Sequence, residues 1–371
     1  MPLKQVAGRN QQTSEGVERL LFPDVLRVVA IFAVIVIHVS ATQFYKSPVM
    51  SYNWQVTNFF ECLVRWGVPV FVMVSGMFFL NPEKEMTLTK LYHKNVFRLV
   101  VALISWGILY RSFHVVKIVI ADKMDLQTVL FTMLKEYSHL IFGPVWYHLW
   151  FLYMIISLYF LVPIFRVFTK NATDKQYRYL FMIFIFFGSI LPFIKDLLML
   201  FDDRLKINFK IAEFTGYACY FILGYYLSKK ELASKTKKWI YCLALISVLF
   251  QILGTFGVSY LQESGHELLY GNSRPNVLIQ AVAIFVFIKD ISARINFSER
   301  TKSIIFALSK YSFGIYLVHD FFNIIFGKIG FTTICINPML AIPLRSVITF
   351  VLSFCVIWIL GRIPIIKKYC M

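Results

Sequence analysis

The residues best suited to chemistry lie in one apolar segment, which runs from Asp24 to His38. It carries Arg27 near its start and His38 eleven positions later. Eleven residues of α-helix make three turns plus roughly 20°, so both side chains lie on one face, about 16 Å apart along the axis. A hydrocarbon core is about 30 Å thick, so an arginine at the surface places the histidine near mid-depth. An ionisable side chain at that depth indicates a functional site.

His38 has two interpretations. A neutral imidazole titrates near physiological pH and can remove a proton from a hydroxyl group, which is general-base catalysis. The structural alternative is a histidine that is hydrogen-bonded inside a helix bundle. Arg27 is either its partner on the same face or a cation that anchors the helix at the membrane surface.

A second candidate group is a basic pair at the start of a later apolar run. Lys94 and Arg98 are four residues apart, so a helix places them on one face at the membrane surface. They either anchor the span on its cytoplasmic side or hold the phosphates of a cytosolic cofactor.

Two further polar groups occur at the ends of apolar runs. His148 and Trp150 begin one run, where aromatic residues are typical of a membrane interface and can equally form a platform for a sugar. His319 and Asp320 end a polar string within another run, which is typical of a cavity or a helix–helix seam. They form either a second proton-handling pair or contacts at the interface.

The composition defines the class of protein. Of 371 residues 58% are hydrophobic, and the mean hydropathy is +0.66. A soluble domain of this length has a more polar composition, so we predict an all-α, polytopic membrane helical bundle. The six cysteines match neither a disulfide framework nor a zinc site, and we expect no metal.

We predict ten spans, separated by short polar loops. They are Val25 to Phe44, Val56 to Leu80, Phe97 to Ile118, Val145 to Val167, Tyr179 to Leu198, Ala212 to Leu227, Trp239 to Tyr260, Asn276 to Ile288, Ser303 to Phe326 and Met339 to Leu360. The expected division is a tail over residues 1–23, a transmembrane domain over 24–362 and a second tail over 363–371. The segment between the third and fourth spans is predicted to be a non-spanning loop that caps an outer cavity.

The net charge of +18 does not indicate a nucleic-acid partner, because the basic residues lie between apolar runs. Alternate loops carry more than twice as many Lys and Arg residues as the others. The positive-inside rule therefore predicts that both termini are cytoplasmic. A basic cytoplasmic face also favours an anionic substrate from the cytosol.

Four motifs together resemble a known family. They are Asp24 to His38, Pro69 to Gly76, His148 to Tyr153 and Tyr311 to His319. In this order they resemble the membrane-bound acyltransferase-3 family of bacterial O-acetyltransferases, especially members that act on surface polysaccharides such as enterobacterial common antigen. The resemblance extends over nearly the whole chain from Asp24.

The resemblance implies roles for particular residues. His38 matches the catalytic histidine, and Arg27 matches the arginine paired with it. Arg98 matches the second arginine of an Arg-x-x-Arg pair that meets acetyl-CoA at the cytoplasmic side. The first position of that pair is Asn95 here, and Lys94 supplies a charge from the neighbouring position.

The expected function is therefore O-acetyl transfer in a bacterial cytoplasmic membrane. Acetyl-CoA bound by Lys94 and Arg98 would donate to a hydroxyl group of a cell-surface or lipid-linked glycan near His148, Trp150 and His319. His38 would act as the general base or carry the acetyl group itself. The alternative is a transporter of a polysaccharide or lipid-linked intermediate, to which intramembrane polar residues are equally suited.

Overall fold

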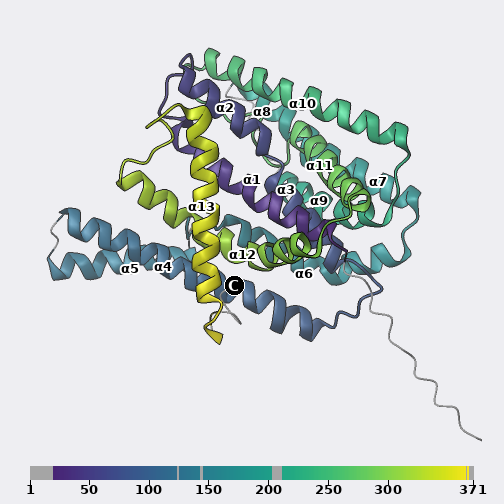
Figure 1. Cartoon of the computed structure of the whole chain (residues 1–371), viewed down its shortest axis with the longest axis horizontal. Coiled ribbons are helices and arrows are strands. Elements are labelled where there is room, and N and C mark those ends of the chain that lie inside the picture. Colours follow the sequence, from purple (N-terminus) through teal and green to yellow (C-terminus); the bar gives the residue numbers. More distant parts are fainter. Residues whose placement is uncertain (1–19, 123–124, 143–144, 203–210, 365, 367–371) are drawn as a thin grey trace, which may run out of the picture.

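The computed structural model describes residues 20–122, 125–142, 145–202, 211–364 and 366, and every regular element in this part of the chain is helical (Figure 1). The first half contains α1 (Phe22–Phe44), α2 (Tyr52–Val64), α3 (Gly67–Phe79), the π-helix η1 (Lys90–Val96), α4 (Phe97–Asp122), α5 (Leu126–Phe142) and α6 (Trp150–Asn171). The second half contains α7 (Asp174–Ile185), the π-helix η2 (Phe186–Ile190), α8 (Leu191–Met199), α9 (Ile211–Lys229), α10 (Ser234–Leu261), α11 (Pro275–Arg294), α12 (Glu299–Lys328) and α13 (Pro338–Leu360).

The predicted all-α polytopic bundle is confirmed. Eight helical stretches among the described residues are long and apolar enough to cross a membrane. Each of the ten predicted spans coincides with one or more helices, and the two spans outside those eight stretches are α9 and α12. The predicted terminal tails fall largely on residues outside the described part of the chain.

Two spans are interrupted, and one predicted loop is helical. The second span breaks between α2 and α3, and the fifth passes through η2. The segment between the third and fourth spans forms α5, which pairs with α4 in a hairpin that projects from the bundle (Figure 1). An ion pair between Arg111 and Glu136 joins these two helices over 2.6 Å.

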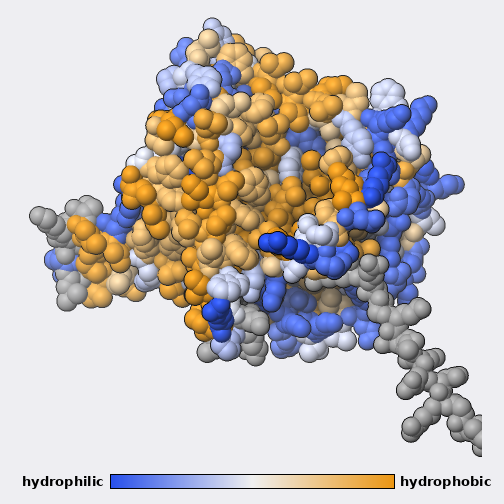
Figure 2. Space-filling model, in the orientation of Figure 1, coloured by the Kyte–Doolittle hydropathy of each residue, from blue (hydrophilic) through white to orange (hydrophobic). Residues whose placement is uncertain are grey.

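One end of the bundle gathers loops rich in lysine and arginine, and we call it the basic end. There Lys229 pairs with Glu83 over 2.8 Å, and Lys237 pairs with Asp290 over 2.7 Å. Figure 2 shows hydrophilic residues concentrated at the right-hand edge of the molecule and a broad hydrophobic surface across its middle. This distribution is that of a protein embedded in a bilayer, with its charged loops in water.

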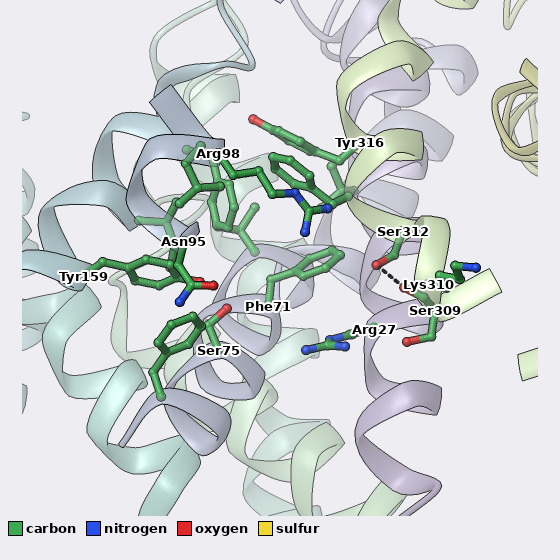
Figure 3. Close-up of a pocket in the computed structure, with 17 residues that line it drawn as sticks. Arg27, Phe71, Ser75, Asn95, Arg98, Tyr159, Ser309, Lys310, Ser312 and Tyr316 are labelled. Atoms are coloured by element: carbon green, nitrogen blue, oxygen red, sulfur yellow. Dashed lines mark hydrogen bonds between the residues drawn. The ribbon is translucent and has the colours of Figure 1, made fainter. Parts of the chain in front are cut away.

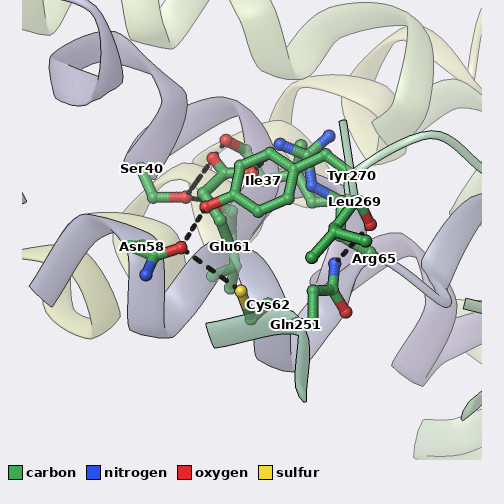
Figure 4. Close-up of polar contacts among 10 residues, drawn as sticks. Ile37, Ser40, Asn58, Glu61, Cys62, Arg65, Gln251, Leu269 and Tyr270 are labelled. Carbon is green, nitrogen blue, oxygen red and sulfur yellow. Dashed lines mark hydrogen bonds and ion pairs between the residues drawn. The ribbon is translucent and has the colours of Figure 1, made fainter. Parts of the chain in front are cut away.

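A buried polar network lies at the opposite end, where α1 finishes (Figure 4). The Ser40 hydroxyl donates to Glu61 over 2.7 Å, and Glu61 also pairs with Arg65. The Arg65 guanidinium lies 4.0 Å from the centre of the Tyr270 ring, and the Tyr270 hydroxyl donates to Asn58 over 2.6 Å. Buried charges require such partners. The network fixes the α10–α11 loop over the end of α1, close to His38.

Helices α3 and α9 pack at backbone distance because both carry glycine at the contact. A Cβ atom at Gly76 would lie 1.7 Å from the carbonyl oxygen of Phe221, and one at Gly224 would lie 2.0 Å from that of Met73. Both distances are far below van der Waals contact, so these glycines set the spacing of the two helices.

We therefore expect Gly76→Ala to destabilise the protein by more than about 3 kcal/mol, the upper range for an overpacked contact. Thermal unfolding in detergent measures the effect. Gly257→Ala is the matched control, because nothing lies within 4 Å of a Cβ atom at that position. A melting temperature equal to that of the wild type for Gly76→Ala would contradict the close approach of α3 and α9.

Candidate active site

A cavity of about 300 Å³ lies among α1, α3, α4, α6 and α12, and we call it the inner cavity (Figure 3). Arg27 and Arg98 point into it from different sides, and Lys310 lies at its edge. Arg98 and Lys310 are exposed, whereas Arg27 stacks over Phe78, with its guanidinium carbon 4.6 Å from the ring centre. Three cations around one cavity are an arrangement that suits an anion with several phosphates.

The far part of the inner cavity is aromatic and apolar. It is lined by Val34, Phe71, Phe151 and Tyr316. Val34 lies four residues before His38 on α1, and the Tyr316 ring centre lies 5.5 Å from that of His148 and 6.0 Å from that of His319. The cavity therefore leads from cations near the start of α1 towards a group of histidines.

Lys94 lies in η1 and Arg98 in the first turn of α4. The Phe97 amide donates to the carbonyl of Tyr92, five residues earlier, as in a π-helix. Asn95 and Arg98 line the inner cavity, whereas the exposed Lys94 side chain is not among its lining residues. Of the predicted pair, Arg98 alone lines the inner cavity.

His38, His148 and His319 come from distant parts of the chain and form one cluster. The His38 ring centre lies 5.1 Å from His319, 6.2 Å from His148 and 5.3 Å from Tyr147. His148 and His319 are fully buried, while His38 retains partial exposure. The sequence identified all three histidines, and the structure brings them together from α1, α12 and the turn before α6.

The hydrogen bonds of the cluster assign its protons. His319 Nδ1 lies 2.6 Å from the carbonyl oxygen of Tyr316. Since a carbonyl only accepts, Nδ1 carries the proton and donates, which leaves a lone pair on Nε2. That atom is buried and has no hydrogen-bond partner among the described residues, and the same holds for both ring nitrogens of His148. Buried polar atoms without partners are rare and indicate a place for a ligand.

Asp320 accepts hydrogen bonds from two aromatic residues beside this cluster. Its carboxylate accepts a hydrogen bond of 2.7 Å from Trp146 Nε1 and another from the Tyr147 hydroxyl. His148 Nδ1 lies 4.0 Å from the same carboxylate. Asp320 therefore positions Tyr147 against His38.

The sequence analysis did not assign a role to Arg345. This residue of α13 is only 2% exposed, donates to the carbonyl of Asn323 over 3.2 Å and interacts electrostatically with Asp320. The sequence does place this arginine within an apolar run, and an ionisable residue in such a run indicates a functional site. Its hydrogen bond to Asn323 of α12 was not predictable, because the sequence does not give the register in which α12 and α13 pack against each other.

Trp150 lies apart from the histidines. It lines a second cavity of about 680 Å³, which we call the lateral groove. Asp196 and Arg274 form an ion pair there, and both also line a neighbouring cavity of about 620 Å³. The structure thus separates Trp150 from His148 and His319, with which it was grouped in the sequence.

In the described part of the chain, no group of three or more His, Cys, Asp or Glu side chains is arranged to hold a metal ion.

A family model described as an acyltransferase domain matches residues 20–362, which is nearly the whole chain. No curated protein and no solved structure matches.

Proposed function

Because this chain belongs to the acyltransferase-3 family, we propose that it is an integral-membrane O-acetyltransferase that uses cytosolic acetyl-CoA. The acceptor is a hydroxyl group of a cell-surface or lipid-linked glycan. The observation that supports the proposal is the inner cavity, which has cations at one end and at the other Tyr316, a residue in contact with the histidine cluster. The site lies in a bacterial cytoplasmic membrane, with the basic end and both termini in the cytoplasm, as the positive-inside rule favours.

The donor binds in the inner cavity. Arg27 and Arg98 hold the phosphates of acetyl-CoA, with Lys310 beside them, because guanidinium groups bind phosphate through two parallel hydrogen bonds. The pantetheine arm lies against Phe71 and Phe151. Lys94 contributes only to the positive field around the opening.

His38 performs the chemistry by one of two routes. In direct transfer, it takes the hydroxyl proton while the oxygen attacks the thioester carbonyl, the C–S bond breaks and the proton passes to the CoA thiolate. In the relay, His38 attacks the thioester and releases CoA, and the acceptor oxygen then takes the acetyl group from the imidazole. Rapid quenching with labelled acetyl-CoA and no acceptor separates the routes, because only the relay leaves label on His38.

A second hydroxyl group of the acceptor, next to the one that is acetylated, donates to the open Nε2 atom of His319. We expect His319→Phe, which keeps a ring but removes this lone pair, to raise the KM for the acceptor by about tenfold, the effect of one lost hydrogen bond. The KM for acetyl-CoA should remain unchanged. Initial rates at varied acceptor and donor concentrations measure both constants. An increase confined to the donor KM would contradict the placement of the acceptor.

Inside-out membrane vesicles test the function. Labelled acetyl-CoA is supplied at the basic end, and the glycan fraction is analysed for label and for a mass increase of one acetyl group. The proposal predicts labelled glycan only when the protein is present. Glycan that crosses the membrane without gaining label would instead identify a transporter.

A further inference from the structure

The lateral groove is built from several helices and one loop. Helix α6 forms one wall, and Gly188 of η2 with Pro192 of α8 forms the other. Helix α9, which packs against both α6 and η2, contributes Tyr217 between them. The end distant from the basic end is closed by the loop from Gly271 to Arg274.

The groove opens sideways into the membrane. Its α6 residues Tyr153 and Ser157 are exposed and begin a stripe that continues along α6 through Phe160, Ile164 and Val167, which are 53%, 65% and 66% exposed. This stripe lies within a helix that is long and apolar enough to span a bilayer. The wall of the groove is therefore continuous with the lipid-facing surface of α6.

The closed end of the groove is polar and aromatic. Trp150 and Tyr217 lie with ring centres 5.7 Å apart, and Asn272 donates to the Tyr217 hydroxyl over 3.2 Å. The Asp196–Arg274 ion pair lies beside them, and the buried Nε atom of Arg274 has no partner among the described residues. Aromatic faces next to amide, carboxylate and guanidinium groups suit a ligand with apolar C–H faces and many hydroxyl groups.

The rest of the groove suits a hydrocarbon chain. Met154, Leu158 and Pro192 line it at the depth of the membrane, and Ser157 satisfies its own hydroxyl by donating to the Tyr153 carbonyl over 2.9 Å. A water-soluble glycan has no group that gains from this surface. A phospholipid has no sugar to occupy the aromatic end.

We infer that the lateral groove binds the acceptor as a lipid-linked glycan, with a sugar against the rings of Trp150 and Tyr217 and the lipid chain along α6. The inference rests on the proposed function and commits it to a lipid-linked acceptor that arrives from within the bilayer.

Helix α6 contributes residues to both the inner cavity and the lateral groove. Phe151 and Ile155 line the inner cavity, whereas Trp150 and Met154 line the groove, so the two sites occupy adjacent faces of one helix. His148 lies two residues before Trp150. Donor and acceptor therefore converge at the start of α6, next to the histidine cluster.

A photoreactive lipid tests the inference. The full-length protein, in bilayers of phosphatidylethanolamine and phosphatidylglycerol, is irradiated with a glucosyl polyprenyl phosphate that carries a benzophenone on its chain. We expect cross-links in α6 and α8, and at least a tenfold loss of capture in Ser157→Trp, which fills the groove. Ile164→Trp, on the exposed stripe but outside the groove, is the matched control and should retain capture.

Trp150→Ala provides a second variant that removes the sugar platform without filling the groove, and it should lose capture to a similar degree. Unchanged capture in both groove variants would overturn the inference, as would displacement of the probe by excess phosphatidylglycerol as readily as by the unlabelled glycolipid. His38→Ala should bind the probe normally. Probe capture without acetyl transfer by the wild type would contradict the proposed function alone, whereas acetyl transfer without groove capture would contradict this inference alone.

Discussion

Replacing His38 with alanine is expected to reduce acetyl transfer by roughly 10²- to 10⁴-fold, the contribution of a well-placed general base. The imidazole lies beyond the aromatic end of the inner cavity and in contact with His319 and Tyr147. Transfer of label from acetyl-CoA to glycan, measured in vesicles with equal amounts of inserted protein, gives the effect.

The control for this variant is His93→Ala, which removes an exposed imidazole from η1 at the basic end. It should transfer acetyl groups at the rate of the wild type. Thermal unfolding of His38→Ala should remain close to that of the wild type, because the smaller side chain leaves every hydrogen bond of the Glu61 network in place. An undiminished rate in His38→Ala would rule out its catalytic role.

Replacing Arg98 with glutamine is expected to raise the KM for acetyl-CoA by about 10- to 100-fold. A hydrogen bond to a charged group contributes about 1.5–3 kcal/mol, and each 1.4 kcal/mol is a factor of ten. Arg98 lines the inner cavity and lies with its guanidinium carbon 5.9 Å from the ring centre of Phe313. The rate at saturating donor should fall much less, because the proposed role of Arg98 is to bind the phosphates of the donor and not to act in the transfer step.

Lys94→Gln removes the same charge four residues earlier and is the matched control. Its side chain is exposed and does not line the inner cavity, so the KM for acetyl-CoA should change by less than about twofold at physiological salt. Similar increases in both variants would show that only the general positive field attracts the donor. A change in Lys94→Gln alone would place the phosphates outside the cavity.

The sequence was sufficient for the architecture, because membrane spans depend on local apolar runs. Each predicted span is helical in the structure, and Arg27 and His38 do lie on one continuous helix, α1. The break near Pro69 and the close approach at Gly76 also follow from residue types that are local in the chain.

The sequence was insufficient where tertiary packing decides which residues line a site. Asn95 and Arg98 line the inner cavity and Lys94 does not, and the sequence does not give the rotation of these helices about their axes. Likewise, His148 and Trp150 are two residues apart yet line different sites, because the turn before α6 directs the first into the histidine cluster. The environment of Arg345 likewise depends on packing, because its hydrogen-bond partner Asn323 belongs to α12.

A structure of the protein with a non-hydrolysable acetyl-CoA analogue, determined by electron cryomicroscopy in a lipid nanodisc, tests the central claim most directly. The account predicts phosphates at Arg27 and Arg98 and the acyl carbonyl beyond Tyr316, within reach of the His38 imidazole. An analogue bound away from the inner cavity, or an acyl group separated from His38 by packed side chains, would contradict it.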